Sequence, residues 1–92
     1  AHHVGGIDAW KRAADIAAGA FRPVVTHLSP EIAVHLAAGI NGVKTVEFMP
    51  WSFGLWEEPM DINADGELIV PQEPGLGVKL NEVVVKAHLI NE

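Results

Sequence analysis

Cysteine is absent from this sequence of 92 residues, and so are clusters of Lys or Arg and long apolar runs. Without cysteine the chain can form neither a disulfide framework nor a thiolate metal site, and we expect it in a reducing compartment, the cytoplasm. No apolar run approaches the roughly 18 residues of a membrane span. The first residues also lack a basic segment followed by an apolar one, so we expect a soluble chain without a targeting leader.

Basic residues are few, and the net charge at pH 7 is −6. Residues 1–46 hold four Lys or Arg against three Asp or Glu, whereas residues 47–92 hold two against nine. An acidic surface without a basic cluster repels phosphate groups, so we expect neither nucleic acid nor an anionic membrane as a partner. The simplest interpretation is that the excess acidic residues form a solvated surface.

Several common site motifs are also missing, namely G-x-S-x-G, the Walker loop and G-x-G-x-x-G. Residues 61–66 read like the first half of a calcium loop, but Gln72 stands where the bidentate glutamate belongs, and a hairpin turn at Asp65-Gly66 fits better. Glu31 and His35 are spaced for local pairing on a helix. We therefore expect no metal site within the chain.

The sequence does contain a large apolar share for its length. Hydrophobic residues make up 49% of the chain, and the mean hydropathy is +0.21. A single domain of this size buries only a limited part of its surface, so it needs polar residues to cover itself. The composition is typical of an interior piece of a larger domain.

The first half of the sequence alternates helical and extended patterns. Apolar residues at positions 7, 10, 14, 17 and 21 have the period of an amphipathic helix, which Arg22-Pro23 should end. Strands are expected at Val24 to Thr26 and Val43 to Phe48, separated by a helix from Pro30 to about Ile40 that Ser29 caps. That helix is apolar almost all round, which predicts burial on several sides. The order predicts an α/β fold with two parallel strands, and such a sheet needs further strands beyond these.

Residues 51–92 change character, because Pro, Gly and acidic residues interrupt shorter runs. The expected elements are a hairpin over 62–70 with Asp65-Gly66 at its tip, a short strand over 78–80, and a last helix from 82 to about 89 capped by Asn81.

Two ionisable residues stand at the expected strand ends, His27 after the first strand and Glu47 within the second. In (β/α) barrels the carboxyl ends of strands supply the reacting groups. A histidine there, just before a helix, suits a general acid/base, although many such histidines are structural. A glutamate in a strand buried on both faces is either salt-bridged outside the chain or held for function. Both interpretations stay open for each residue on pattern alone.

Aromatic and histidine residues supply weaker candidates. Trp51 and Trp56 follow Glu47 and either wall a substrate pocket or pack into a core, and Trp51 is the candidate substrate-binding residue. His2 and His3 are adjacent and point apart on an extended chain, so they cannot chelate one metal and are interpreted as linker residues.

Taken in order, these residues resemble a known family. The matching string comprises Gly5-Gly6-Ile7, Val25-Thr26-His27-Leu28, Glu31, His35 to Ala38, Val46-Glu47-Phe48, Asp65-Gly66, Val70-Pro71 and Pro74 to Gly77. It is similar to the C-terminal part of the mandelate racemase and muconate lactonizing enzyme-like group of the enolase superfamily, over nearly the whole chain.

The resemblance implies a TIM-like (β/α) barrel with a separate capping domain. Residues 1–50 would be its last helix-strand-helix-strand segment, and residues 51–92 a C-terminal extension that packs towards the capping domain. Enzymes of this superfamily remove the proton α to a carboxylate while Mg²⁺ stabilises the enediolate. His27 would then be the general acid/base, and Glu47 the carboxyl that hydrogen-bonds the substrate carboxylate.

Other parts of the family's site lie outside the matching region. The aspartate that orients the histidine would fall immediately before Ala1, and three acidic metal ligands, a lysine-bearing strand and the capping domain come earlier still. The chain alone is therefore expected to bind no catalytic Mg²⁺ and to be inactive. Its expected partners are the remainder of the barrel, the capping domain and a carboxylate substrate, and the parent is expected to be a homo-oligomer.

Dehydration of an acid sugar is the activity that we favour for the complete enzyme. Racemisation or epimerisation is the alternative, because it begins with the same proton abstraction. The alternative from another class is a non-catalytic binding or assembly module, which would fold as a stable monomer or homo-oligomer of these 92 residues.

Overall fold

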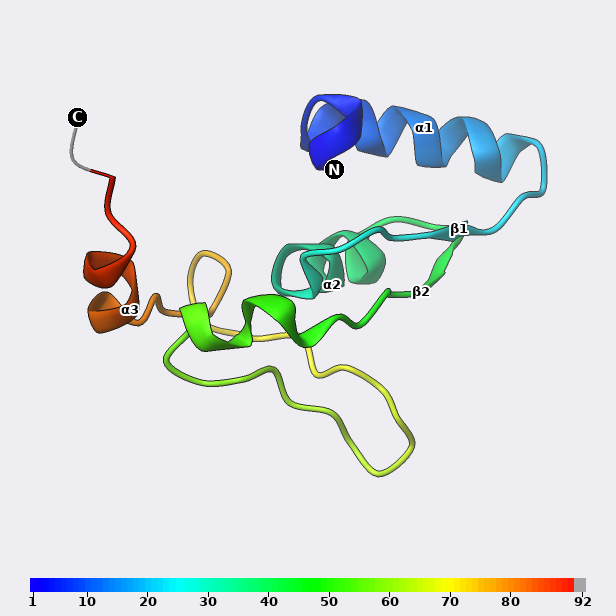
Figure 1. Cartoon of the computed structure of the whole chain (residues 1–92). Coiled ribbons are helices and arrows are strands. Elements are labelled where there is room, and N and C mark those ends of the chain that lie inside the picture. The colour runs from blue at the N-terminus through cyan, green and yellow to red at the C-terminus, as the bar shows by residue number, and fades with distance from the viewer. Residues whose placement is uncertain (91–92) are drawn as a thin grey trace. The chain divides into compact units, whose positions relative to one another are not determined.

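The computed structural model describes residues 1–90 and divides into two compact units, one of residues 1–49 and one that begins at Pro50. The first unit contains, in chain order, the 3-10 helix η1 His2–Val4, α1 Ile7–Gly19, β1 Val24–Val25, α2 Pro30–Gly39 and β2 Val43–Thr45 (Figure 1). The second contains the 3-10 helix η2 Pro50–Leu55 and α3 Glu82–Ala87.

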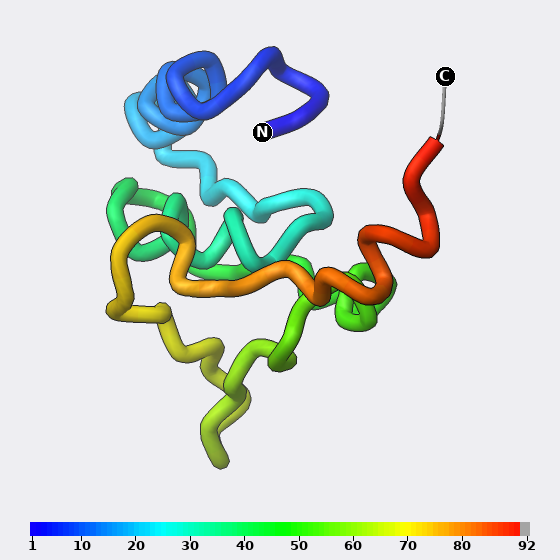
Figure 2. The backbone as a smooth tube through the Cα atoms, turned by 90° about the vertical axis from the view of Figure 1, so that its left-hand side faces the viewer, coloured from blue at the N-terminus to red at the C-terminus, as the bar shows by residue number. Residues whose placement is uncertain are grey.

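β1 and β2 form a two-stranded parallel sheet, and α2 connects them. Val24 lies opposite Val43 and Val25 opposite Thr45, with an irregularity in the register between the two positions. In Figures 1 and 2 the chain leaves α1, runs back along β1 and enters α2. The prediction of an α/β fold with two parallel strands is therefore confirmed.

The core of the first unit joins both helices to β2. Trp10 and Ala14 of α1 pack in one cluster with Leu36 of α2 and Val43 of β2. Each helix directs apolar side chains towards the strands. Burial of these side chains stabilises the packing of the helices against the sheet. The buried part of α1 is only the middle of the predicted stripe, because Ile7 and Phe21 are exposed.

Helix α1 ends two residues earlier than predicted, at Gly19. Phe21 adopts a left-handed conformation with φ 54°, and its N–H donates to the Ala18 carbonyl. The Arg22 N–H donates to the Ala17 carbonyl, which completes a Schellman motif. The chain therefore turns out of the helix before the proline is reached.

Both strands are shorter than predicted, and the expected burial of the second strand on both faces is wrong. β1 ends at Val25 and β2 at Thr45, so Glu47 lies beyond the paired region. Val43 is buried, but Lys44 and Thr45 are exposed. Within residues 1–90 helices cover only one face of the strand pair. Helix α2 is buried on several sides, as predicted, because Pro30, Glu31, Ala33, Val34 and Leu36 are all buried, and only its last two residues, Ala38 and Gly39, are exposed.

The second unit contains the predicted turn and the predicted last helix. Ile62 and Leu68 form an antiparallel bridge around a turn in which Gly66 has φ 80°, as expected for the hairpin. Asn81 caps α3, because its side-chain oxygen accepts hydrogen bonds from the N–H groups of Val83 and Val84. The expected strand over 78–80 is reduced to one bridge between Leu80 and Trp56.

Gly77 is required by its surroundings. Its φ is +68°, and a Cβ atom added there would lie 2.3 Å from Cβ of Pro71. A proline ring cannot swing aside as a long side chain can, so any larger residue would force the backbone apart.

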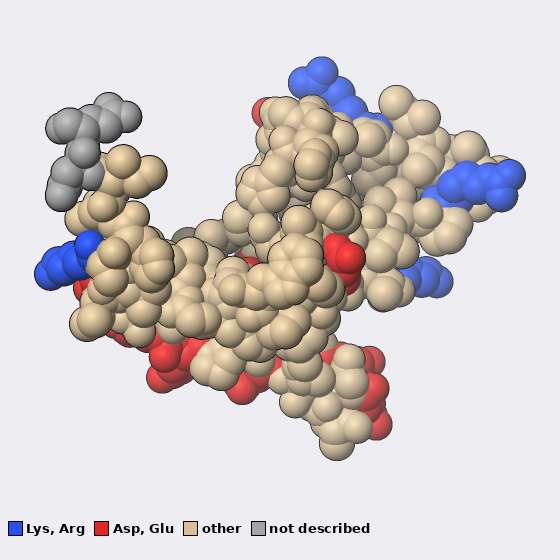
Figure 3. All heavy atoms as spheres, viewed as in Figure 1, with Lys and Arg blue, Asp and Glu red and all other residues tan. Residues whose placement is uncertain are grey.

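Acidic side chains are concentrated in the second unit, and Figure 3 shows Asp and Glu in groups on the molecular surface. All of those between residues 50 and 90 are exposed: Glu57, Glu58, Asp61, Asp65, Glu67, Glu73 and Glu82. A solvated surface is consistent with this exposure. In the part of the chain that the structure describes, no helix is long and apolar enough to cross a membrane.

The 92-residue chain on its own is expected to self-associate or to melt without a cooperative transition. Its hydrophobic core is small, while Phe21 is 94% exposed, Val83 78% and Ile16 75%. Exposed apolar surface of this kind drives association. Circular dichroism melting with analytical sedimentation tests the expectation, and cooperative unfolding of a monomer would instead favour a free-standing module.

Candidate functional site

The candidate site lies where β1 and β2 end. Thr26 and His27 directly follow β1, and Glu47 comes two residues after β2. Because the strands are parallel, their carboxyl ends meet at one edge of the sheet. Thr26 is 5% exposed, Glu47 is half-buried and His27 is exposed. At this edge of the sheet the imidazole of His27 is therefore accessible, and the carboxyl group of Glu47 is partly buried.

Two hydrogen bonds join Glu47 to the segment that carries His27. The Leu28 N–H donates to Oε2 of Glu47 at 2.7 Å, and the Glu47 N–H donates to Oγ1 of Thr26 at 3.1 Å. These partners are the two chain neighbours of His27. The structure thus brings together the segments of both residues predicted as catalytic, which lie twenty positions apart in the sequence.

The first residues of the chain contact the same loop, so the interpretation of His2 and His3 as linker residues is wrong. The rings of His3 and His27 lie edge to face, with centroids 5.2 Å apart and an interplanar angle of 64°. Nε2 of His2 lies 2.9 Å from Oγ of Ser29. Residues 2–4 form a 3-10 helix, so the alternation expected of an extended chain does not apply.

Ser29 occupies the predicted N-cap position of α2, but its side chain does not cap the helix. Its backbone is left-handed, with φ 47° and ψ 61°, whereas a capping serine usually has an extended backbone. The Ser29 carbonyl accepts the N–H groups of Ile32 and Ala33, which starts the helix. The hydroxyl is turned to His2 instead.

Leu28 also has positive φ, 56°, so two adjacent residues with side chains are left-handed. Each such residue costs about 1 kcal/mol or more relative to ordinary backbone. Strained backbone of this kind persists only where its surroundings over-determine it, and it is common at functional sites. The sequence carries no glycine here that would signal the turn.

The remaining candidates lie elsewhere or have partners of their own. Trp51 lies in η2 of the second unit and is 76% exposed, so its indole face is accessible. Trp56 is partly buried, and its indole nitrogen has no hydrogen-bond partner among the described residues. Glu31 is only 2% exposed and His35 is half-buried, and the pairing between them stays a prediction.

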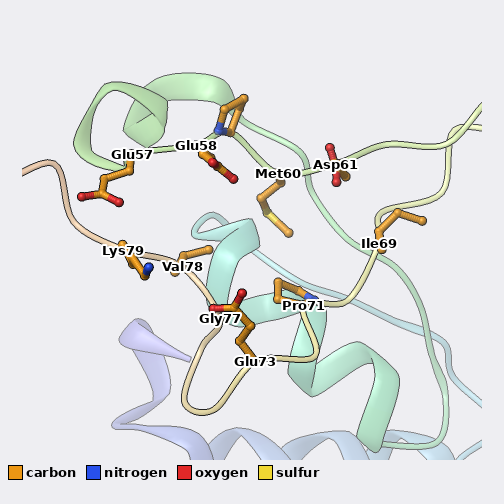
Figure 4. Close-up of a pocket in the computed structure, with 11 residues that line it drawn as sticks. Glu57, Glu58, Met60, Asp61, Ile69, Pro71, Glu73, Gly77, Val78 and Lys79 are labelled. Carbon is orange, nitrogen blue, oxygen red and sulfur yellow. The ribbon is translucent and has the colours of Figure 1, made fainter.

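A pocket in the second unit was not predicted from the sequence (Figure 4). Its volume is about 260 Å³, and its lining includes Met60, Ile69 and Pro71. The charged residues of the lining are Glu57, Glu58, Asp61, Glu73 and Lys79. Across residues 1–90 no group of three or more His, Asp or Glu side chains is placed to hold a metal ion.

Comparison with known proteins gives concordant results. The model of the enolase C-terminal domain-like family matches residues 1–84. D-xylonate dehydratase from Haloferax volcanii is 30% identical over 95 residues, covering 95% of this chain and 23% of that protein.

Solved structures of similar sequence have the same fold. An enolase from alpha proteobacterium BAL199, determined with bound magnesium, has a TM-score of 0.86 and 38% identity over 95% of this chain. L-talarate dehydratase from Polaromonas sp. JS666, in complex with magnesium and L-glucarate, has a TM-score of 0.80 and 36% identity over 90%.

The chain spans about a quarter of the length of these proteins, namely 24% of the first solved chain and 23% of the second. The match nevertheless extends through both units described above, and it agrees with the resemblance in the residue pattern. The chain belongs to the enolase C-terminal domain-like family.

Proposed function

We propose that this chain forms the last helix-strand-helix-strand segment and C-terminal extension of a TIM-like barrel enzyme that dehydrates an acid sugar. The observation that carries the proposal is the hydrogen bond from the Leu28 N–H to Oε2 of Glu47, which joins the carboxyl to the strand end bearing His27. Similarity to a D-xylonate dehydratase and to an L-talarate dehydratase complexed with L-glucarate supports the substrate class.

His27 is proposed as the general acid/base. An imidazole can take up and return a proton near neutral pH, and this one is exposed at the carboxyl edge of the strands. It would either accept the proton α to the substrate carboxylate or protonate the β-hydroxyl as that group leaves as water. In dehydration the α C–H and β C–O bonds both break, and their electrons form the new double bond and the departing oxygen lone pair.

Glu47 is proposed to hydrogen-bond the substrate carboxylate. When the α-proton leaves, negative charge accumulates on the carboxylate oxygens, and a donor placed there lowers the barrier. Because the Leu28 N–H holds one carboxyl oxygen of Glu47 and the Thr26 hydroxyl holds its backbone N–H, the carboxyl would already be oriented before the substrate arrives. Such preorganisation removes the cost of rearranging the group during the reaction.

Magnesium is expected in the complete enzyme, where its positive charge would stabilise the enediolate. The residues described here do not fit a magnesium site, since residues 1–90 contain no cluster of three candidate ligands. We therefore assign the ligands, together with the aspartate that orients His27, to parts of the enzyme outside this chain. The chain alone is then inactive.

Several further assignments belong to the same proposal. Trp51, with its exposed indole, would line the substrate pocket in the complete enzyme. The remainder of the barrel and the capping domain would cover the apolar surface that is exposed here, and a cytoplasmic homo-oligomer stays our prediction.

A racemase or epimerase is the alternative, since the roles of His27 and Glu47 in the first step would be identical.

Replacing His27 should remove the proton-transfer step while leaving the metal site intact. In the complete enzyme, His27→Asn is expected to slow exchange of the substrate α-proton with deuterated solvent by about 10²- to 10⁴-fold. Mg²⁺ affinity should be unchanged. NMR of the substrate and metal titration measure the two quantities, and His88→Asn, an exposed histidine after α3, serves as the matched control. Retained exchange in His27→Asn would remove it from this role.

Replacing the carboxyl of Glu47 should weaken stabilisation of the developing charge. Glu47→Gln keeps the shape and an oxygen for the Leu28 N–H, but its amide is a far weaker acid. We expect exchange of the α-proton to fall by about 10²- to 10³-fold. Glu58→Gln, at an exposed carboxylate of the second unit, is the control. Equal rates for the two variants would rule out the proposed role of Glu47.

Shortening Trp51 should weaken substrate binding more than turnover. Loss of the indole face in Trp51→Ala is expected to raise KM for the acid sugar by about tenfold, with kcat changed less than about threefold. Trp51→Phe, which keeps an aromatic face, should lie close to the wild type. Steady-state kinetics give both constants, and an unchanged KM in Trp51→Ala would place the residue outside the pocket.

A further inference from the structure

The backbone pairing at the site departs from a regular ladder first at the register shift between Val24 and Val25, and again just beyond β2. The Val24 N–H donates to the Gly42 carbonyl at 3.1 Å, and the Thr26 N–H donates to the Thr45 carbonyl at 3.4 Å. In a parallel ladder the next bond would run from the Glu47 N–H to the Thr26 carbonyl. The Glu47 N–H instead donates to the Thr26 hydroxyl.

The hydroxyl thus extends the strand pairing beyond the point where β1 and β2 end. Thr26 is 5% exposed, so its side chain is shielded from competing water. Its position directly before His27 ties the backbone of Glu47 to the strand end that carries the imidazole. A partly buried backbone amide left without an acceptor costs free energy, so this hydrogen bond favours the observed position of Glu47.

The left-handed turn at Leu28 supplies the second contact. Immediately after His27, the Leu28 N–H donates to Oε2 of Glu47 at 2.7 Å. Oε2 therefore has a fixed partner within the chain, and Oε1 is the carboxyl oxygen left to contact a ligand.

We propose that the Thr26 hydroxyl and the Leu28 amide form a two-point clamp that fixes Glu47, and that Thr26 is a positioning residue for the reaction. The proposal rests on the proposed function for its catalytic consequence. Thr26 contacts no reacting atom and acts through the placement of the Glu47 carboxyl group.

Two variants of Thr26 in the complete enzyme separate the hydroxyl from the bulk of the side chain. Thr26→Val keeps the branched shape and removes the acceptor, whereas Thr26→Ser keeps the acceptor. We expect kcat of Thr26→Val to fall by about tenfold with KM changed less than about threefold, and Thr26→Ser to stay within about threefold of the wild type. Thermal unfolding of both variants shows whether the fold is retained.

A second measurement does not depend on turnover. Amide hydrogen exchange at Glu47 and Leu28 should be protected in the wild type and in Thr26→Ser and should be about tenfold faster in Thr26→Val. If Thr26→Val unfolds, Thr26→Ala and Thr26→Ser are compared in the same way. Equal amide exchange in the hydroxyl-bearing and hydroxyl-free variants would overturn the clamp.

A double-mutant comparison tests the route through Glu47. In a Glu47→Gln background, Thr26→Val is expected to lower the remaining kcat by less than about twofold. The carboxyl group that Thr26 positions is already absent from that background. Effects that multiply would show that Thr26 acts by another path. Absence of α-proton exchange in the wild type would reject the proposed function alone, since the amide exchange result judges the clamp independently.

Discussion

The position of the Glu47 carboxyl depends on one contact, the hydrogen bond between the Leu28 N–H and Oε2 of Glu47. Parallel pairing brings the ends of β1 and β2 to one edge, but the paired region stops at Val25 and Thr45. Without a further link, Glu47 would lie on a free segment beyond the sheet. The Leu28 amide, with the Thr26 hydroxyl, converts this loose end into a defined position beside the segment of His27.

Backbone strain accompanies this arrangement. Leu28 and Ser29 both have positive φ, 56° and 47°, although neither is glycine. The left-handed conformation and the contact with Glu47 therefore occur at the same residue, Leu28. The same turn lets Ser29 start α2 through its carbonyl and leaves its hydroxyl for His2. The strained backbone lowers local stability, and it accompanies the placement of the Glu47 carboxyl group.

Much of this could be predicted from the sequence, and the failures have physical causes. The helices and the parallel order follow from apolar periodicity, and the proximity of the two segments that carry His27 and Glu47 follows from the parallel order. The contact of His3 could not be predicted, because adjacent histidines give no sign that residues 2–4 form a 3-10 helix. The sequence indicates Thr26 only as a strand former, since nothing in a β-branched run shows that one hydroxyl replaces a backbone acceptor. The length and burial of β2 depend on strands outside this chain, so its own residues could not indicate them.

We propose that His27 and Glu47 face one substrate from adjacent strand ends. A crystal structure of the complete enzyme with Mg²⁺ and an unreactive acid-sugar analogue tests it most directly. We expect Oε1 of Glu47 to lie within hydrogen-bond distance of the analogue carboxylate, Oε2 to keep the Leu28 N–H, and the His27 ring to face the α-carbon. A carboxylate bound away from Glu47, or a His27 ring turned from the α-carbon, would contradict it.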